Sequence, residues 1–475
     1  MAHRVLQNIS RVIDANFDQL LENLRQLVAI ESVEGTPSTG KPFGEAIQTA
    51  LEMVLDLGQN MGFTARNHQG YVGTIDWGSG SEMIGVLTHV DVVPPGDLAD
   101  WDTPPFELSE KDSYLCGRGV VDDKGPLLSA LYGLYALKEL GIPFEKRVRI
   151  IIGTNEESGW GCIKYYRTNC ESPTTSICPD GMFTVVNREK GIITVSFSKE
   201  LPMELCSGLS VHGGEASNLV PARATALLPF CSPEQRANIA KAIEEQPWVA
   251  GHTFKIEEKG PSILELTCQG KSTHAMTPAQ GINAILGLLS WLVSGDCFAK
   301  ELKDEFSTIL HLVGETPDGA AMGLACHDEL SGALTVNLGK IDLENGRLTL
   351  QFDIRTPVTF SVENILGQVK ALWREKGYRL VEQVVKSPLY VPGDSPLIKK
   401  LCAVYQSVTG EEPVIHSIGG GTYARAFPNC VCFGSVYPDE KLTVHSPNEQ
   451  TLADNIRQNA KMYGLAIHQL IKDNE

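Results

Sequence analysis

The sequence has little that points to a membrane or to nucleic acid. No stretch of the 475 residues approaches the roughly 18 consecutive apolar residues of a membrane span, and the first residues lack the apolar core of a signal peptide. The formal net charge is −18 and there is no long basic run, which argues against nucleic acid as a partner. We therefore expect a cytoplasmic protein that binds neither membranes nor nucleic acids.

Cysteine pairs with CxxC spacing are also absent, although the chain has 12 cysteines. The nearest two, Cys430 and Cys432, alternate along an expected strand. This distribution favours reduced, buried thiols over a disulfide framework or a cysteine metal site. An apolar content of 42% and a charged content of 21% are typical of a globular protein. A chain of 475 residues exceeds one ordinary core, so we expect two or more domains.

Short polar clusters follow apolar, β-branched runs in the first half of the chain. The runs at 83–88, 148–154 and 176–178 are typical of buried parallel strands, and 126–140 has a helical pattern. Strands that alternate with helices predict an α/β fold with a mainly parallel sheet, whose ligands bind at the carboxyl ends of the strands. The clusters that fall there are His89 with Asp91, Asp122 with Asp123, Glu156 with Glu157, and Asp180.

These side chains suit a divalent cation. Carboxylates and imidazole are ligands for zinc, and also for manganese or cobalt. Adjacent acids such as Glu156 and Glu157 repel each other unless a cation neutralises them or one shifts its pKa. His89 and Asp91 share one face of a strand, so Asp91 can orient the imidazole. For Asp122 and its neighbour, a helix N-cap followed by a surface acid is the alternative that the residues alone leave open.

The order of these motifs resembles a known family. The segments THVDVVPPG at 88–96, GRGVVDDKGP at 117–126 and NEE at 155–157 are similar to the di-zinc metallopeptidases. That family includes aminoacylase, carnosinase, succinyl-diaminopimelate desuccinylase and bacterial glutamate carboxypeptidase. Within it, the chain most resembles the dipeptidase V branch of lactic acid bacteria and staphylococci. The resemblance implies a hydrolase with two Zn²⁺ per chain, which Mn²⁺ or Co²⁺ could replace.

The resemblance also implies a role for each residue of the site. One cation would be bound by His89 and Asp180, and the other by Glu157 and His445. His445 lies in the segment TVHSPN at 443–448, far along the chain from the other motifs. In the family pattern, Asp122 bridges the two cations and Glu156 is the general base. His445 precedes an expected helix, and only the motif match supports its assignment.

After Asp180 the organisation changes to alternating strands and amphipathic helices, with a hairpin turn predicted at Asn345-Gly346. We expect an inserted α+β domain at 190–385 and a discontinuous catalytic domain formed by 1–189 and 386–475. In the resembled branch the insert is enlarged, acts as a lid and mimics a partner subunit. The size of the insert therefore implies a monomer.

Four stretches after Asp180 match substrate-contacting residues of the family. His274 corresponds to a donor for the scissile carbonyl oxygen, and a polar loop histidine is the alternative. Arg355 corresponds to the anchor of the substrate carboxylate, and a salt bridge with Asp353 is the alternative. Asn218 corresponds to a further substrate contact. The glycines Gly420 and Gly421 lie in a turn that the family uses in its substrate pocket.

The function expected from this resemblance is metal-dependent hydrolysis of dipeptides with a free amino terminus, with β-alanyl dipeptides among the candidates. An N-acyl amino acid amidohydrolase or deacylase is the alternative, since the same metal core serves both reactions. A catalytically inactive metal- or peptide-binding protein is an alternative of another class. The presence of Glu156 argues against it, because loss of this base is the simplest route to inactivity.

Overall fold

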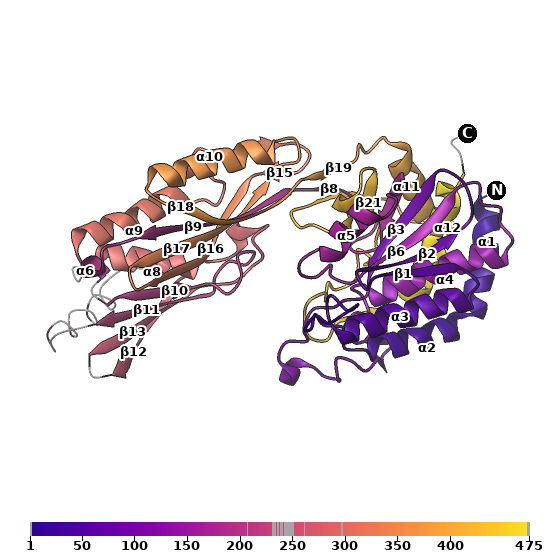
Figure 1. The fold of residues 1–475 in the computed structure, drawn as a ribbon, viewed down its shortest axis with the longest axis horizontal. Coiled ribbons are helices and arrows are strands. Elements are labelled where there is room, and N and C mark those ends of the chain that lie inside the picture. Colours follow the sequence, from indigo (N-terminus) through magenta and orange to yellow (C-terminus); the bar gives the residue numbers. More distant parts are fainter. Residues whose placement is uncertain are drawn as a thin grey trace. The chain divides into compact units, whose positions relative to one another are not determined.

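A computed structural model describes residues 2–206, 208–229, 251–260, 262–295 and 298–472, together with positions 234, 237 and 241. The chain forms two compact units. Unit 1 comprises 1–187, 390–416 and 421–475, and unit 2 comprises 188–389 and 417–420. The chain passes between the units at four points: within β8 (Val185–Glu189) and β19 (Leu389–Tyr390), which Figure 1 labels, within β20 (Ile415–Ile418), and between Gly420 and Gly421.

Unit 1 is built on a sheet with the order β1-β2-β6-β3-β7-β21-β8-β19, with β20 paired to β8. The strands not yet located are β1 (Thr64–His68), β2 (Val72–Trp77), β3 (Met83–His89), β6 (Arg147–Gly153), β7 (Thr175–Cys178) and β21 (Cys430–Cys432). The four central strands β6, β3, β7 and β21 are parallel, and the pairs β1–β2, β2–β6 and β21–β8 are antiparallel. In the parallel core, His89 at the end of β3 lies beside Gly153 at the end of β6.

The central strands are buried because helices cover the sheet. All seven residues of β3 are buried, as expected for a parallel strand of Val, Ile and Leu. The helices of unit 1 are α1 (Ala2–Ala15), α2 (Phe17–Val28), α3 (Glu45–Asn60), α4 (Lys124–Glu139), α5 (Gly161–Asn169), α11 (Pro396–Thr409) and α12 (Ala453–Leu470). Helix α4 packs on β3 and β6, and α12 packs on α4. A Cβ atom at Gly133 of α4 would lie 2.6 Å from the backbone nitrogen of Gly464, so glycine allows these two helices to approach closely.

A small second sheet connects two distant parts of unit 1. Its order is β22-β5-β4, formed by Gln450–Leu452, Tyr114–Cys116 and Ser109–Lys111. The antiparallel pairing places Gln450 opposite Cys116. This sheet therefore holds the segment after His445 against the segment that leads to Asp122.

Unit 2 contains an antiparallel eight-stranded sheet with the order β12-β13-β11-β10-β16-β17-β9-β18. These strands are β9 (Gly191–Glu200), β10 (Ser210–Gly213), β11 (Arg223–Pro229), β12 (Thr253–Gly260), β13 (Ile263–Gln269), β16 (Thr335–Glu344), β17 (Arg347–Thr356) and β18 (Arg379–Lys386). Strands β16 and β17 form the hairpin predicted at Asn345-Gly346, where both residues have positive φ. A two-stranded sheet joins β14 (His327–Asp328) and β15 (Gly332–Ala333).

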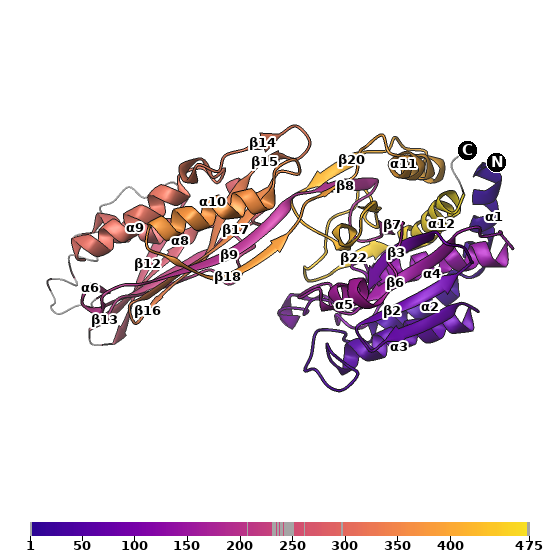
Figure 2. The same ribbon diagram turned by 45° about the horizontal axis from the view of Figure 1, so that its top comes forward.

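One face of the eight-stranded sheet carries the core of unit 2. Alternate residues of β17, Leu348, Leu350, Phe352 and Ile354, belong to a single buried cluster with residues of the helices. The helices that supply it are α8 (Ala284–Ser294), α9 (Lys300–Val313) and α10 (Val362–Glu375), which run along the sheet in Figure 2. The short helix α6 (Met203–Cys206) adds Cys206. The period of two in β17 places Asp353 and Arg355 on the opposite face.

The expected α/β fold with a mainly parallel sheet and an α+β part is confirmed. The structure adds antiparallel strands at both edges of the unit 1 sheet and the helix α1, which the sequence interpretation did not include. The ten cysteines in the described part of the chain are all free thiols. Among the described helices, none combines the length and the apolar character needed to cross a membrane.

Candidate metal centre

The polar clusters of the first half lie where the central strands of unit 1 end. His89 is the last residue of β3, Glu156 and Glu157 follow β6, and Asp180 follows β7. Asp122 and Asp123 lie just before α4, and His445 lies between β21 and β22. All five residues expected as metal ligands therefore belong to one unit, as does the expected base Glu156.

The carboxylate of Asp122 lies between two imidazoles. Its Oδ1 is 3.1 Å from Nε2 of His89, and its Oδ2 is 3.0 Å from Nε2 of His445. The same Nε2 of His445 lies 3.1 Å from Oε2 of Glu157. The two oxygens of Asp122 thus face two separate ligand groups, which is the arrangement that a bridging carboxylate requires.

His89 is held in the orientation that a metal ligand needs. Its Nδ1 lies 2.9 Å from the backbone oxygen of Asp91, and a carbonyl oxygen only accepts hydrogen bonds. The proton on Nδ1 is therefore donated to Asp91, and Nε2 is the ring atom that faces Asp122. The carboxylate of Asp91 is 3.6 Å from Nδ1, and its Oδ2 instead accepts the backbone N–H of Glu157 at 3.0 Å. Asp91 thus contacts His89 through its carbonyl and the Glu157 loop through its side chain.

The Asp122–Asp123 pair is not a simple helix cap. Asp123 occupies the N-cap position of α4, but its side chain makes no capping hydrogen bond. Its Oδ2 accepts the backbone N–H of His89 at 3.1 Å. The peptide bond between the two aspartates is cis, a form that is rare outside proline and that no sequence pattern indicates.

Negative charge accumulates at this position. Burial acts to raise the pKa of Asp122, but its close contacts with His445 and His89 outweigh burial and hold this pKa far below its usual range. The hydrogen bonds to Asp122 and Glu157 raise the pKa of His445 to about 11. Burial and then the charge of Asp122 raise the pKa of Asp180 to about 7. The carboxylates therefore stabilise positive charge among them.

Glu156 belongs to the same electrostatic cluster. Burial is the largest influence on its carboxyl group, and the charges of Asp180 and Glu157 add to it, so its pKa lies well above the usual value. A raised pKa is a property of carboxyl groups that accept and donate protons near neutral pH.

The side chains fit a divalent cation. In the described part of the chain, His89, Asp122 and Glu157 place one ligand atom each within 4.8 Å of one another. The buried atoms Nε2 of His89, Oδ1 of Asp122 and Oε1 of Glu157 make no hydrogen bond of acceptable geometry. Buried polar atoms without partners are costly. A cation would provide the missing partner, and carboxylate and imidazole donors suit Zn²⁺, Mn²⁺ or Co²⁺.

Sequence interpretation missed several residues that hold this centre in place. The buried Lys124 donates from its Nζ to the backbone oxygen of Ile30 at 2.7 Å. The hydroxyl of Tyr423 contacts Sγ of Cys162, and its ring lies edge-on to His89. Glu449 accepts hydrogen bonds from the loop that carries Asp122. Lys124 lies in the motif at 117–126, but no sequence pattern indicates the partners of these three residues.

The residues expected to contact substrate from the insert lie close together in unit 2. The backbone N–H of Ala275 donates to the oxygen of Asn218 at 2.8 Å, and Leu219 pairs with His274 in an isolated bridge. Asn218 is exposed and His274 is half-buried.

Arg355 joins this group through Gly419. Its guanidinium donates to the Gly419 oxygen at 2.9 Å, and a Cβ atom at Gly419 would lie 2.5 Å from Cβ of Met276. Arg355 also forms the salt bridge with Asp353 that was the alternative to substrate binding. Gly420 belongs to unit 2, whereas Gly421 belongs to unit 1, where a Cβ atom would meet the guanidinium of Arg425 at 2.6 Å.

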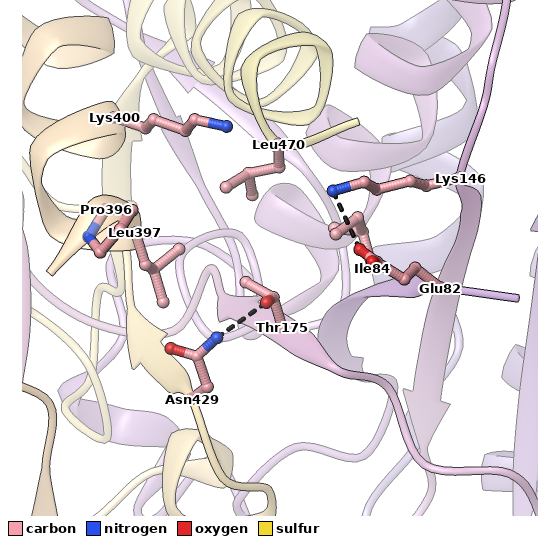
Figure 3. Close-up of a pocket in the computed structure, with 9 residues that line it drawn as sticks. All are labelled: Glu82, Ile84, Lys146, Thr175, Pro396, Leu397, Lys400, Asn429 and Leu470. Carbon is pink, nitrogen blue, oxygen red and sulfur yellow. Dashed lines mark hydrogen bonds and ion pairs between the residues drawn. The ribbon is translucent and has the colours of Figure 1, made fainter. Parts of the chain in front are cut away.

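A hollow of about 210 Å³ lies at the other end of the unit 1 sheet (Figure 3). Ile84 and Thr175 line it at the amino ends of β3 and β7. Its polar groups bind one another: Glu82 pairs with Lys146 at 2.9 Å, and Asn429 donates to Thr175 at 2.7 Å. Ligands of parallel sheets bind at the carboxyl ends of the strands, so the metal centre is the stronger candidate for an active site.

Comparison with known proteins identifies the family. The model of "Peptidase family M20/M25/M40" matches residues 85–469. The chain belongs to this peptidase family. The M20 assignment confirms the family resemblance and makes the protein a metallopeptidase. A relative from Bacillus subtilis, "Putative dipeptidase YtjP", is 35% identical over 470 residues, which cover 96% of this chain and 98% of the relative. A "Putative dipeptidase" from Staphylococcus epidermidis is 32% identical, with coverage of 95% and 97%.

Solved structures share the fold at low sequence identity. Dug1p, a di-peptidase from Saccharomyces cerevisiae, aligns over 100% of both chains with a TM-score of 0.59 and 15% identity. Human carnosine dipeptidase 1 aligns over 98% of this chain and 99% of its own, with a TM-score of 0.56 and 16% identity. These two likenesses support the fold and not the choice of substrate.

Proposed function

We propose that this M20 peptidase hydrolyses dipeptides with a free amino terminus, with β-alanyl dipeptides among its substrates, and that it uses two divalent cations to activate water. The observation that carries the proposal is the position of Asp122, whose two oxygens face His89 and His445. The relatives named as dipeptidases in Bacillus subtilis and Staphylococcus epidermidis support the choice of substrate class. We further propose that the chain belongs to the dipeptidase V branch.

The proposed ligand set combines the family pattern with the closeness of His89, Asp122 and Glu157. His89 and Asp180 would bind one Zn²⁺, Glu157 and His445 would bind the other, and Asp122 would bridge them. Mn²⁺ or Co²⁺ suits the same donors. When bound, the cations lower the pKa of a coordinated water toward neutrality and polarise the scissile carbonyl.

The chain's own side chains carry out the proton transfers. Glu156 takes a proton from the attacking water and passes it to the leaving amine. This role requires a carboxyl group whose pKa is raised, as burial and neighbouring acids ensure for Glu156. Asp91 keeps the Nε2 atom of His89 directed at the metal position by accepting from Nδ1 through its carbonyl.

Residues of unit 2, together with Gly421 of unit 1, are proposed to bind the substrate. His274 would donate to the carbonyl oxygen as it gains charge. Arg355 would bind the carboxylate of the substrate, with Asn218, Gly420 and Gly421 as further contacts. A clamp on the carboxylate limits the distance to the scissile bond, which suits a dipeptide.

The alternative within the family is an N-acyl amino acid amidohydrolase, and one matched pair of substrates separates the two activities. Hydrolysis of a free dipeptide and of its N-acetyl counterpart is measured with Zn²⁺, Mn²⁺ or Co²⁺ supplied. We expect the free dipeptide to be preferred. Preference for the acetylated compound would assign the protein to the deacylases. Absence of turnover of both, with metal bound, would favour the metal- or peptide-binding alternative.

We also propose that the protein acts as a monomer in the cytoplasm. The enlarged insert supports the monomer, because in the resembled branch it mimics a partner subunit. Light scattering during size-exclusion chromatography tests this directly, and a mass of twice 51.7 kDa would contradict it.

A further inference from the structure

Glu449 is a buried carboxylate that lies next to the proposed metal centre without belonging to its ligand set. Its residue has no exposed surface, and it follows His445 by four positions. We propose that Glu449 is a positioning residue, which fixes the two ligand-bearing loops of Asp122 and His445 relative to each other so that both can bind cations. This inference rests on the metal-dependent function proposed above.

The side chain of Glu449 gathers the backbone of the loop that ends at Asp122. Its Oε1 accepts the N–H groups of Val121 at 2.8 Å and Asp122 at 3.1 Å. The N–H of Gly119 lies 3.1 Å from Oε1 and 3.0 Å from Oε2. Three N–H groups near the bridging carboxylate thus share one acceptor, and the orientation of the Asp122 peptide depends on it.

The backbone around Glu449 holds the two loops together at their other end. Its carbonyl oxygen accepts the N–H of Gly117 at 3.0 Å. The next residue, Gln450, begins β22 and pairs with Cys116 of β5. The segment from Cys116 to Asp122 is therefore fixed to the segment from His445 to Gln450 by backbone pairing and by one side chain.

The loop of His445 has a left-handed backbone at two positions. His445 has a φ of 58° and Asn448 a φ of 57°, values that are uncommon outside glycine and that Asn and His adopt more often than most residues. Asn448 binds a third loop: its Oδ1 accepts the N–H of Asp102 at 2.8 Å, and its Nδ2 donates to the oxygen of Asp100 at 3.1 Å. The segment that follows His445 is therefore tied to two other loops, through Asn448 and through Glu449.

Arg118 completes the arrangement by balancing the charge of Glu449. Its Nη1 lies 2.8 Å from Oε2 of Glu449, and Arg118 is 1% exposed. Its guanidinium carbon lies 5.2 Å from the ring centroid of Trp101, whose Nε1 donates to the oxygen of Pro95. A carboxylate is required at position 449 because both of its oxygens accept hydrogen bonds. The NH₂ group of an amide side chain would instead face the N–H donors of Arg118 or of the Asp122 loop.

The test compares cation binding by the full-length protein and by Glu449→Gln and Glu449→Asp. The first variant keeps the size and loses the charge; the second keeps the charge and shortens the side chain. Asp76→Asn is the matched control, because Asp76 also binds a buried arginine through two oxygens, but on β2 and away from the ligand loops. Dissociation constants for Zn²⁺ and Mn²⁺ are measured by competition with a chelator, with unfolding midpoints recorded alongside.

We expect both Glu449 variants to fold and to bind the cations at least 10-fold more weakly, which is the usual scale for residues that orient ligands. At saturating cation, kcat should fall while KM for a dipeptide changes little, and Asp76→Asn should leave cation affinity unchanged. Unchanged affinity in folded Glu449 variants would overturn the inference. Failure of both variants to fold, while Asp76→Asn folds, would overturn it too and assign Glu449 to general stability. Absence of cation binding by the unaltered protein would instead overturn the proposed function.

Discussion

Arg355 and Asp353 form a two-point ion pair on one face of β17. Nε and Nη2 of Arg355 lie 2.6 and 2.9 Å from the two carboxylate oxygens of Asp353, and Nη1 lies 2.9 Å from the oxygen of Gly419. The two residues are 4% and 1% exposed. The pair orients the guanidinium, so a structural role and a substrate-binding role predict different results when both partners are replaced.

The first prediction concerns the stability of this pair. Arg355→Met leaves the charge of Asp353 buried and unpaired, so it should lower the free energy of unfolding by about 3–5 kcal/mol. The double variant Arg355→Met with Asp353→Leu removes both charges and should recover most of this loss. Urea unfolding of the single and double variants measures the effect.

The same double variant tests the proposed substrate contact. If Arg355 binds the substrate carboxylate, the double variant should regain stability but keep a raised KM for free dipeptides. The KM for C-terminally amidated dipeptides should change less. Recovery of both stability and the preference for a free carboxylate would remove Arg355 from substrate binding.

The second prediction separates the adjacent glutamates. Glu156→Gln removes the proposed base and should lower kcat by about 10²–10⁴-fold with the metal content unchanged. Glu157→Gln removes a proposed ligand and should weaken cation binding. Metal analysis of the two purified variants, with kcat measured at saturating cation, gives the comparison. Metal loss in the first variant and metal retention in the second would exchange the two roles.

The third prediction concerns removal of the metal. Buried acids repel one another unless a cation neutralises them, so a chelator should lower the unfolding midpoint and added Zn²⁺ or Mn²⁺ should restore it. At a free cation concentration of 100 times Kd, the gain is about 2.7 kcal/mol per site. Asp180→Asn is the matched variant. It removes one buried negative charge, so added cation should raise its unfolding midpoint much less than that of the unaltered protein. A midpoint insensitive to chelator and cation would contradict a structural contribution from the metal.

The site could be predicted from sequence where local pattern and topology coincide. His89, Glu157 and Asp180 each follow a short apolar run, and parallel strands bring such strand ends to one edge of a sheet. His445 has no such signal, because it lies in a loop 265 residues after Asp180, and only its motif pointed to the centre. Asp122 was identified as a metal residue, but the cis peptide bond that follows it has no sequence signal.

Glu449 shows why other residues could not be found from sequence. An acid in a loop before a helix is usually solvated, and the sequence around Glu449 does not distinguish it. Its partners are backbone N–H groups 327 to 330 positions earlier in the chain, as well as one arginine. Backbone groups leave no trace in side-chain patterns, so a contact of this kind becomes visible only in three dimensions. The partner of Lys124, the carbonyl of Ile30, escaped prediction for the same reason.

The fourth prediction concerns pH and a histidine outside the metal centre. His468 of α12 is 3% exposed and its Nδ1 makes no hydrogen bond in the described part of the chain. Burial, and then the charge of Lys472, lower the pKa of His468 to about 4. An unfolded chain has a histidine pKa of about 6.5, so it binds the proton more readily than the folded protein does between these two values.

The contribution of neutral His468 to the free energy of unfolding should therefore be fully present above pH 6.5 and be lost as the pH falls toward 4. Between pH 7.5 and pH 5 the loss should be about 2 kcal/mol, and His468→Gln should not show it. The measurement is urea unfolding of chelator-treated protein at both pH values, because chelation removes the pH dependence of metal binding. His327→Gln, at an exposed position of β14, is the control and should behave like the unaltered protein. Equal acid sensitivity in the His468 variant and the unaltered protein would show that other groups cause the loss.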